Sequence, residues 1–144
     1  MTTSGYTTHK FTVILNKNLE PGVALNAAAH LAAGLVSQAN NGIREQMRFI
    51  DFTDKDGGIH PTISALSLIV LRGTSNEIRK ARNEAKRRNI LFADFTRTMT
   101  GDTYVEQLER TQATAEAELE YYGICLFGEK VELDEFTRKL SLWR

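Results

Sequence analysis

The stretch Val13-Ile-Leu-Asn-Lys-Asn-Leu-Glu-Pro-Gly-Val-Ala-Leu-Asn-Ala-Ala-Ala-His30 decides the fold of this chain. Its opening residues are apolar and partly β-branched, which predicts a buried strand over residues 10–15. An acidic residue and a proline at Glu20-Pro21 suit the start of a helix, because proline fits the first helical turn. From residue 22 to 39 the apolar side chains return every three or four positions. A thin, alanine-rich helix that packs closely on a sheet is therefore expected there.

The rest of the chain alternates further apolar strands with helices. The sequence predicts strands at residues 47–52, 64–71, 90–93 and 123–127, and helices at residues 76–88, 102–121 and 134–141. The turn residues at 53–58 close a hairpin, and Trp143 is expected to pin the C-terminus. Val105, Leu108, Ala115 and Leu119 are the buried positions expected for the helix at 102–121.

This order of elements favours an α/β fold, with a mixed four- or five-stranded sheet sandwiched by helices. The expected organisation is a flexible N-terminal tail over residues 1–8, followed by a single domain over residues 9–144.

The composition is that of one soluble domain. The chain has 144 residues, of which 42% are hydrophobic and 25% charged. Its one cysteine, Cys125, excludes an internal disulfide and lies in an apolar run, so we expect a core residue and not a nucleophile. No stretch reaches the roughly 18 apolar residues of a membrane span, and residues 1–9 lack the apolar segment of a signal peptide. We therefore expect a cytoplasmic protein with no membrane partner.

The charged residues leave nucleic-acid binding open in one segment. The formal net charge is zero, unlike the strongly basic total of a dedicated nucleic-acid binder. Residues 79–88 nevertheless hold six Lys or Arg. They fit either contacts with RNA phosphates or a solvated helix face on which Glu84 pairs with Lys80 and Arg88. The three histidines lack metal-ligand spacing and the glycines form no phosphate-binding loop, so neither a metal nor a cofactor is expected.

Two short motifs resemble those of type II peptidyl-tRNA hydrolases. In that family a strand and a loop ending in glycine lead into a helix, with a histidine eight residues after the glycine, as with Gly22 and His30 here. The family's Asp-Ala-Gly-Arg-Thr motif is similar to Asp94-Phe-Thr-Arg-Thr98. The closing segment from residue 123 to 143 also matches the last strand and helix of that fold.

The resemblance covers most of the chain and is interrupted by two expected insertions, the Phe49–Pro61 hairpin and the helix at 102–121. A branch of the fold known only as a domain-of-unknown-function family is the closer match. Its members similarly carry a Gly-x-x-His-Pro-like stretch, found here at residues 57–61. Two family residues are replaced: Val23 stands where the active hydrolases have a lysine, and Ala27 where they have a glutamine.

The resemblance implies a site at the start of the alanine-rich helix and the end of the 90–93 strand. Ester hydrolysis needs an activated water and a group that stabilises the developing oxyanion. Asp94 is the candidate for orienting water and Thr98 for donating to the substrate, unless the two only tie down a turn. His30 is the third candidate catalytic residue, or a satisfied histidine at the core edge. The candidate ligand-binding residues are Lys17, Gly22, Asn26 and Arg97.

Two functions follow from these features. The first is a binding or regulatory module on a hydrolase-like scaffold that has lost its catalytic lysine. The second is a hydrolase of a peptidyl-tRNA-like or small acyl ester that uses Asp94 and Thr98. The resemblance also implies a homodimer, with tRNA or a small acyl compound as ligand. Both functions require the start of the alanine-rich helix, with Asn26, and the end of the 90–93 strand, with Asp94, to line one shared cavity. If Asn26 and Asp94 lie on opposite sides of the molecule, the hydrolase-scaffold interpretation is wrong.

Overall fold

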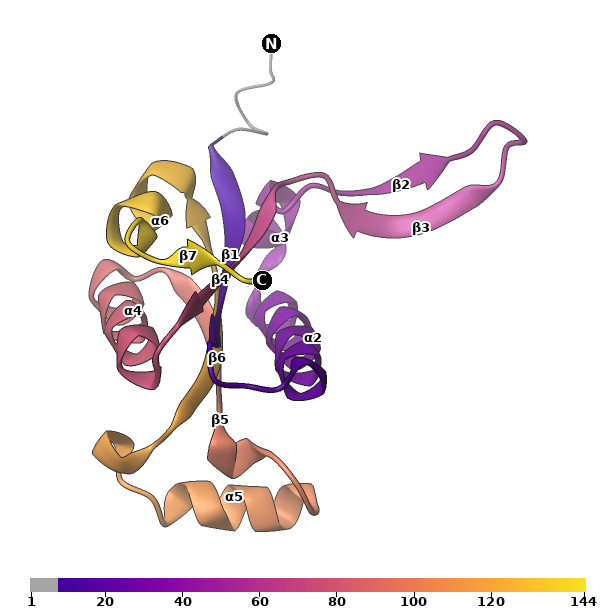
Figure 1. Cartoon of the computed structure of the whole chain (residues 1–144). Coiled ribbons are helices and arrows are strands. Elements are labelled where there is room, and N and C mark those ends of the chain that lie inside the picture. The colour runs from indigo at the N-terminus through magenta and orange to yellow at the C-terminus, as the bar shows by residue number, and fades with distance from the viewer. Residues whose placement is uncertain (1–7) are drawn as a thin grey trace.

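The computed structural model describes residues 8–144. The expected tail of residues 1–8 lies, apart from Thr8, outside the described residues. A five-stranded sheet with the strand order β5-β6-β1-β4-β7 forms the centre of the molecule (Figure 1). Its strands are β1 (His9–Asn16), β4 (Leu68–Gly73), β5 (Leu91–Thr96), β6 (Tyr121–Glu129) and β7 (Ser141–Leu142).

The sheet is mixed. Strand β1 pairs with β4 in parallel, whereas β6 is antiparallel to both β1 and β5. Strands β1, β4 and β5 therefore run in one direction and end at the same end of the sheet. Strand β5 is an edge strand, so one side of its backbone has no neighbouring strand within the sheet.

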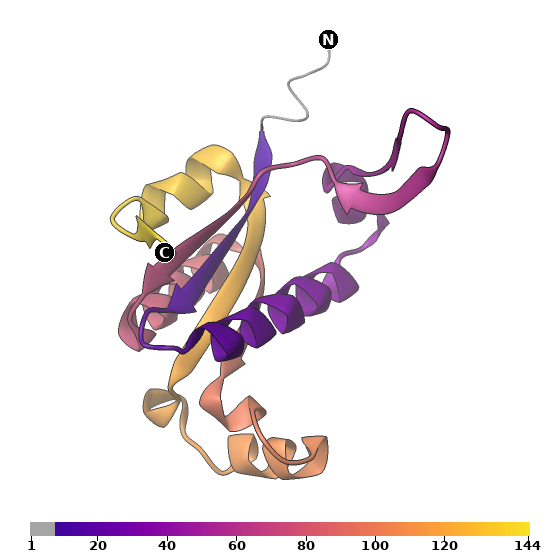
Figure 2. The ribbon, with the colours of Figure 1, turned by 45° about the vertical axis from the view of Figure 1, so that its right-hand side comes forward.

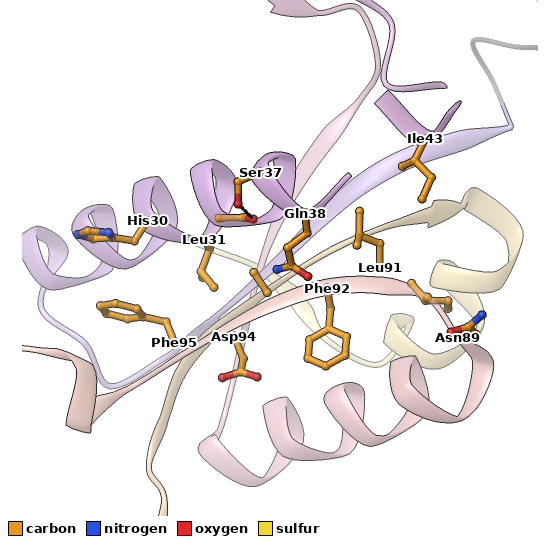
Figure 3. Close-up of a pocket in the computed structure, with 13 residues that line it drawn as sticks. His30, Leu31, Ser37, Gln38, Ile43, Asn89, Leu91, Phe92, Asp94 and Phe95 are labelled. Carbon is orange, nitrogen blue, oxygen red and sulfur yellow. Dashed lines mark hydrogen bonds between the residues drawn. The ribbon is translucent and has the colours of Figure 1, made fainter. Parts of the chain in front are cut away.

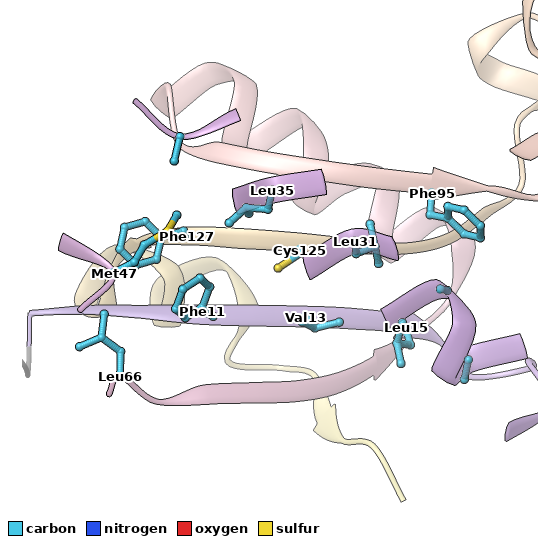
Figure 4. Close-up of a cluster of buried hydrophobic side chains, with 13 residues drawn as sticks. Phe11, Val13, Leu15, Leu31, Leu35, Met47, Leu66, Phe95, Cys125 and Phe127 are labelled. Carbon is cyan, nitrogen blue, oxygen red and sulfur yellow. The ribbon is translucent and has the colours of Figure 1, made fainter. Parts of the chain in front are cut away.

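Helices cover both faces of the sheet, as the sequence predicts. Helices α2 (Pro21–Gln38) and α3 (Asn41–Gln46) lie on one face, and α4 (Ser75–Arg88) and α6 (Lys130–Thr137) lie on the other (Figure 1). Two hydrophobic clusters result, one on each face. Residues Val13 and Leu15 of β1 point to the α2 cluster drawn in Figure 4, and Ile14 points to the α4 cluster. Burial on both faces explains why β1 is a continuous apolar run.

Local signals set the helix ends. Pro21 occupies the start of α2. Helix α4 begins with a capping box, in which the Thr74 hydroxyl accepts from the backbone N–H of Glu77 and the Glu77 carboxylate accepts from the N–H of Thr74. It ends at Asn89, whose φ of 58° is the left-handed conformation of a helix C-terminus.

Two expected core features are confirmed. Cys125 is fully buried, and burial raises the pKa of its thiol to about 12, so it is protonated at neutral pH. The backbone N–H of Trp143 donates to the carbonyl of Val70 at 2.9 Å, and the indole packs on the α2 cluster. Trp143 therefore holds the C-terminus on the sheet. Among residues 8–144, no helix is long and apolar enough to cross a membrane.

The helix expected over residues 102–121 is wrong in length and in burial. Helix α5 spans only Tyr104–Gln112, and a short 3₁₀ turn, η2 (Glu116–Glu118), and the first residue of β6 occupy the rest. Val105 and Leu108 are 47% and 57% exposed, and Ala115 is also exposed. The apolar spacing misleads because α5 lies beyond the end of the sheet (Figure 1) and buries no residue. Leu119, outside the helix, is partly buried against the α4 cluster.

The expected hairpin is confirmed but stands apart from the sheet. Strands β2 (Phe49–Thr53) and β3 (Ile59–Ser64) pair only with each other. The strand expected at 64–71 is therefore wrong at its start, because Ser64 ends β3 and the sheet strand begins at Leu68. Figure 2 shows the hairpin projecting from the body on the side of α2.

Candidate functional site

A groove follows the free edge of β5. Its volume is about 710 Å³, and its walls come from α2 on one side and the C-terminal end of α4 on the other (Figure 3). The polar or aromatic side chains that line it are His30, Ser37, Gln38, Asn89, Phe92, Asp94 and Phe95. The groove therefore combines a strand edge with aromatic rings on both faces of the strand.

His30 stands on the α2 wall. Its imidazole stacks on the ring of Phe95, with 5.5 Å between ring centroids and 9° between ring planes. The residue is exposed to solvent. His30 is thus a solvent-accessible ring that stacks on Phe95 and lines the groove, and not a buried core histidine.

Asp94 points the opposite way. Neighbouring residues of a strand face opposite sides of the sheet, so Asp94 faces α4 while Phe95 faces α2. There its carboxylate accepts a hydrogen bond of 2.8 Å from the Nε of Arg82, and the two side chains are 18% and 22% exposed. The guanidinium of Arg82 also lies over the ring of Phe92, 5.6 Å from its centroid.

The pair is an ion pair with little access to water. Partial burial lowers the pKa of Arg82, but the hydrogen bond and charge of Asp94 outweigh this and raise the pKa above its ordinary value. The carboxylate of Asp94 is therefore already held by a permanent cation. Because one carboxylate oxygen already accepts from Arg82, fewer acceptor sites of Asp94 are left to orient a water molecule.

Thr98 and Arg97 lie at a second cavity, of about 520 Å³, next to α5. The Thr98 hydroxyl is hydrogen-bonded to those of Thr96 and Thr111, at 2.7 and 2.8 Å. Arg97 is an exposed side chain 3.6 Å from Glu120. Asp94 and Thr98, neighbours in the motif, therefore line different cavities.

The remaining candidates lie around the start of α2. Lys17, Gly22 and Asn26 are exposed and line neither cavity. Asn26 belongs to the helix on one face of the sheet, whereas Asp94 faces the other. Of the seven candidates, His30 and Asp94 line the groove at β5 from opposite faces of the strand, and Arg97 and Thr98 line the second cavity.

Sequence reasoning missed Phe92, Phe95 and Arg82. The alternation in Phe92-Ala-Asp-Phe95 shows that Phe92 and Phe95 face opposite sides, but no local signal marks β5 as an edge strand. By sequence Arg82 belongs to the basic cluster of residues 79–88, and its pairing with a carboxylate twelve residues later is a tertiary contact.

The basic cluster of α4 is largely paired. Arg79 contacts Glu116, and Glu84 accepts from both Arg87 and Arg88, while Arg88 also reaches Glu135. The expected Glu84–Arg88 pair is present, and Arg87 takes the place expected for Lys80, so the pairing favours the solvated helix face. Among residues 8–144 no group of three or more His, Cys, Asp or Glu side chains has a geometry that could hold a metal ion.

The comparisons with known proteins agree with this picture of the fold. A solved structure, that of the protein of unknown function Atu0240 from Agrobacterium tumefaciens strain C58, is 21% identical in sequence. It superposes with a TM-score of 0.76 over 94% of this chain and 97% of that one, which shows a shared fold. Curated proteins include no match to the chain. Residues 9–144 match the family described as protein of unknown function DUF2000, and the chain belongs to that family.

Proposed function

We propose that this chain is a binding module whose ligand is an extended peptide segment of a partner protein, seated along the free edge of β5. The observation that carries the proposal is the groove itself: an unpaired strand edge forms the floor of a cavity of about 710 Å³. An added strand satisfies the backbone N–H and C=O groups that an edge strand leaves unpaired.

The lining of the groove fits a peptide with little charge. Phe92 and Phe95 face opposite sides of β5, so each can contact alternate side chains of an added strand. The charges of Asp94 and Arg82 compensate each other at 2.8 Å. Ser37, Gln38 and Asn89 add polar groups that can fix the ligand's position.

The geometry supports binding better than ester hydrolysis. Val23 replaces the lysine of the active hydrolases, Asp94 is held by Arg82, and Thr98 lines another cavity. Asn26 and Asp94 face opposite sides of the sheet, which contradicts the shared cavity that a hydrolase-like site requires. Only the resemblance of residues 13–30 and 94–98 to type II peptidyl-tRNA hydrolases still supports a scaffold of that kind. The single buried cysteine fits the reducing cytoplasm, where we expect the protein to act.

A peptide-display experiment tests the proposal. A random 12-residue peptide library is selected on the wild-type protein, and the enriched peptides are measured against Ser37→Trp. The new indole fills the groove from the α2 wall, so we expect binding to weaken at least about tenfold. The matched control Asn83→Trp, on the solvent face of α4, keeps wild-type affinity. Selection without enrichment, or equal binding to both variants, contradicts a peptide groove at β5.

Incubation with a model peptidyl-tRNA tests the second candidate, an ester hydrolase, which the shared groove of His30 and Asp94 favours. We expect no turnover by the wild type. Turnover that disappears in Asp94→Asn supports the enzyme instead. A retarded tRNA band at low salt without turnover supports an RNA ligand, the other binding candidate.

A further inference from the structure

A further large cavity lies where the β2–β3 hairpin leaves the body beside α3 (Figure 2). Its volume is about 860 Å³, larger than that of the groove at β5. The end of α2, helix α3 and the base of the hairpin supply its lining, which consists of Val36, Asn41, Arg44, Glu45, Arg48, Phe49, Ile50 and Thr62. We call this space the hairpin-base cavity. It shares no lining residue with the groove at β5.

Hydrogen bonds at the base of the hairpin hold the walls of this cavity in place. The hydroxyl of Ser64 donates to the carbonyl of Met47 at 2.5 Å, and the N–H of Ala65 donates to the carbonyl of Arg48 at 2.9 Å. Met47 is itself fully buried in the α2 cluster. The return strand of the hairpin is therefore tied to the end of α3. The cavity is formed without a ligand, as is usual for small-molecule sites.

Part of the lining is apolar. Val36 and Phe49 are half-buried residues that pack against the α2 cluster and also line the cavity. Ile50 adds a side chain that is 40% exposed. A ligand that covers these three side chains removes apolar surface from water, which favours binding. We therefore expect a ligand of this cavity to have an apolar body.

A guanidinium group from α3 lines the same cavity. The Nη2 of Arg44 donates to the carbonyl of Ala39, just after the end of α2, at 2.9 Å. This contact orients the side chain, but a carbonyl group carries no net charge. Among residues 8–144, Arg44 has no carboxylate as an ion-pair partner. Its positive charge is therefore available to a negatively charged ligand.

A second guanidinium belongs to Arg48, which occupies a backbone position where glycine is the usual residue. Arg48 follows the end of α3 with a φ of 55°. The left-handed conformation is common just after a helix, and glycine adopts it without the clash that a Cβ causes. Strained positions of this kind cluster at ligand sites. An arginine at this position fits a use for its side chain in the cavity.

We propose that the hairpin-base cavity binds a small organic acid. Its carboxylate is held by Arg44 and Arg48, and its apolar body lies against Val36, Phe49 and Ile50. The planar guanidinium group of arginine offers pairs of N–H donors that match the two oxygens of a carboxylate. The volume of the cavity is in the range of small-molecule sites.

The charge of the lining selects among anions. Two arginines and Glu45 leave one net positive charge, which matches a singly charged carboxylate better than a doubly charged phosphate. No residue of the 94–98 motif lines this cavity. The ligand is thus a free acid at a separate site and not an ester at Asp94.

An NMR titration of the ¹⁵N-labelled full chain tests the proposal. The ligands are 2-naphthoate and 4-phenylbutanoate, which have a rigid and a flexible apolar body, their neutral amides, and inorganic phosphate. We expect at least one acid to shift the amide signals of residues that line the hairpin-base cavity, with a Kd below about 1 mM. The corresponding amide and phosphate are each expected to bind at least about tenfold more weakly.

Two variants with matched controls separate the charged and apolar contacts. Arg48→Gln is expected to weaken binding of the acid about tenfold and to leave binding of the amide unchanged, because only the acid loses a charge-assisted hydrogen bond. Ile50→Ser weakens binding of both. The controls keep wild-type affinity: Arg138→Gln at the exposed end of α6, and Ile59→Ser at a 66% exposed hairpin position outside the lining. The NMR spectrum of each variant checks its fold.

Any of three results overturns the proposal. The first is the absence of a saturable shift with either acid. The second is equal affinity for an acid and for its amide or phosphate. The third is an acid that binds Arg48→Gln as tightly as the wild type. Peptide binding at β5 involves other residues, so its failure leaves this test unaffected.

Discussion

At the scale of single residues, the groove depends on side chains that act in pairs. The carboxylate of Asp94 is paired with the guanidinium of Arg82, and the same guanidinium also lies over the ring of Phe92. His30 is held by stacking on Phe95. Phe92 contacts Arg82 on one face of β5, and Phe95 contacts His30 on the other.

The Arg82–Asp94 pair gives a stability prediction. Arg82→Ala leaves a carboxylate that is only 18% exposed without its cation. We expect the free energy of unfolding to fall by about 1–3 kcal/mol, because a mostly buried charge has lost its partner. Arg87→Ala, on a side chain that is 65% exposed, is the control and changes the free energy by less than about 0.5 kcal/mol. Urea unfolding measures both, and equal effects contradict this account.

At the scale of elements, two helices with the same type of cap have different roles. Helices α4 and α5 both begin with a threonine–glutamate capping box. Helix α4 buries Ile78, Ala81 and Ala85 in the core, whereas α5 buries no residue. The same local signal therefore starts both helices, but only α4 is tied to the sheet.

A pair of cap substitutions separates these roles. Thr74→Ala removes the cap of α4 and is expected to lower the free energy of unfolding by about 1 kcal/mol. Thr103→Ala removes the cap of α5 and is expected to fray that helix with little global effect, because no core contact depends on it. Hydrogen exchange of α5 amides and urea unfolding together measure the two outcomes. A global loss as large in Thr103→Ala as in Thr74→Ala is inconsistent with an exposed insertion.

At the scale of the whole molecule, Tyr121 connects distant segments where β6 begins. Its carbonyl accepts from the side chain of Asn16, and its N–H donates to the hydroxyl of Ser75. Its phenol donates to Glu116, and Arg79 lies over its ring. Tyr121 thus links the end of β1 and the start of β6 to the start of α4 and to the segment that follows α5.

This position predicts a loss of stability in alkali. Burial, followed by the hydrogen bond to Glu116, raises the pKa of Tyr121 to about 12. The unfolded chain releases this proton near pH 10, so the stabilisation is complete below pH 10 and declines as the pH rises towards 12. We expect a loss of about 1 kcal/mol, discounted because Glu116 is half exposed and water screens the contact. Tyr121→Phe has a shallower decline of unfolding free energy between pH 9 and 11, and parallel curves contradict the assignment.

Local sequence determined much of the fold. The apolar β-branched runs, Pro21, the capping residue Thr74 and the turn at residues 53–58 each act through neighbouring backbone. The elements that they mark appear where expected. The helix over residues 102–121 failed, because apolar spacing in Val105 and Leu108 is a sign of burial only where another surface is present to receive it.

Only the tertiary structure decided the site. The order of the strands made β5 an edge, and that order depends on contacts between residues far apart in the chain. Alternation along β5 then turned Asp94 towards Arg82 and Phe95 towards His30, while Thr98 joined the segment around α5. The sequence by itself indicated most of the strands and helices, since these depend on local geometry. It was wrong over residues 102–121 and for the closing helix, which was expected at 134–141 but spans Lys130–Thr137, with Ser141 in the short strand β7. Which side chains share a groove, and which apolar surfaces stay open, were decided by packing between distant segments.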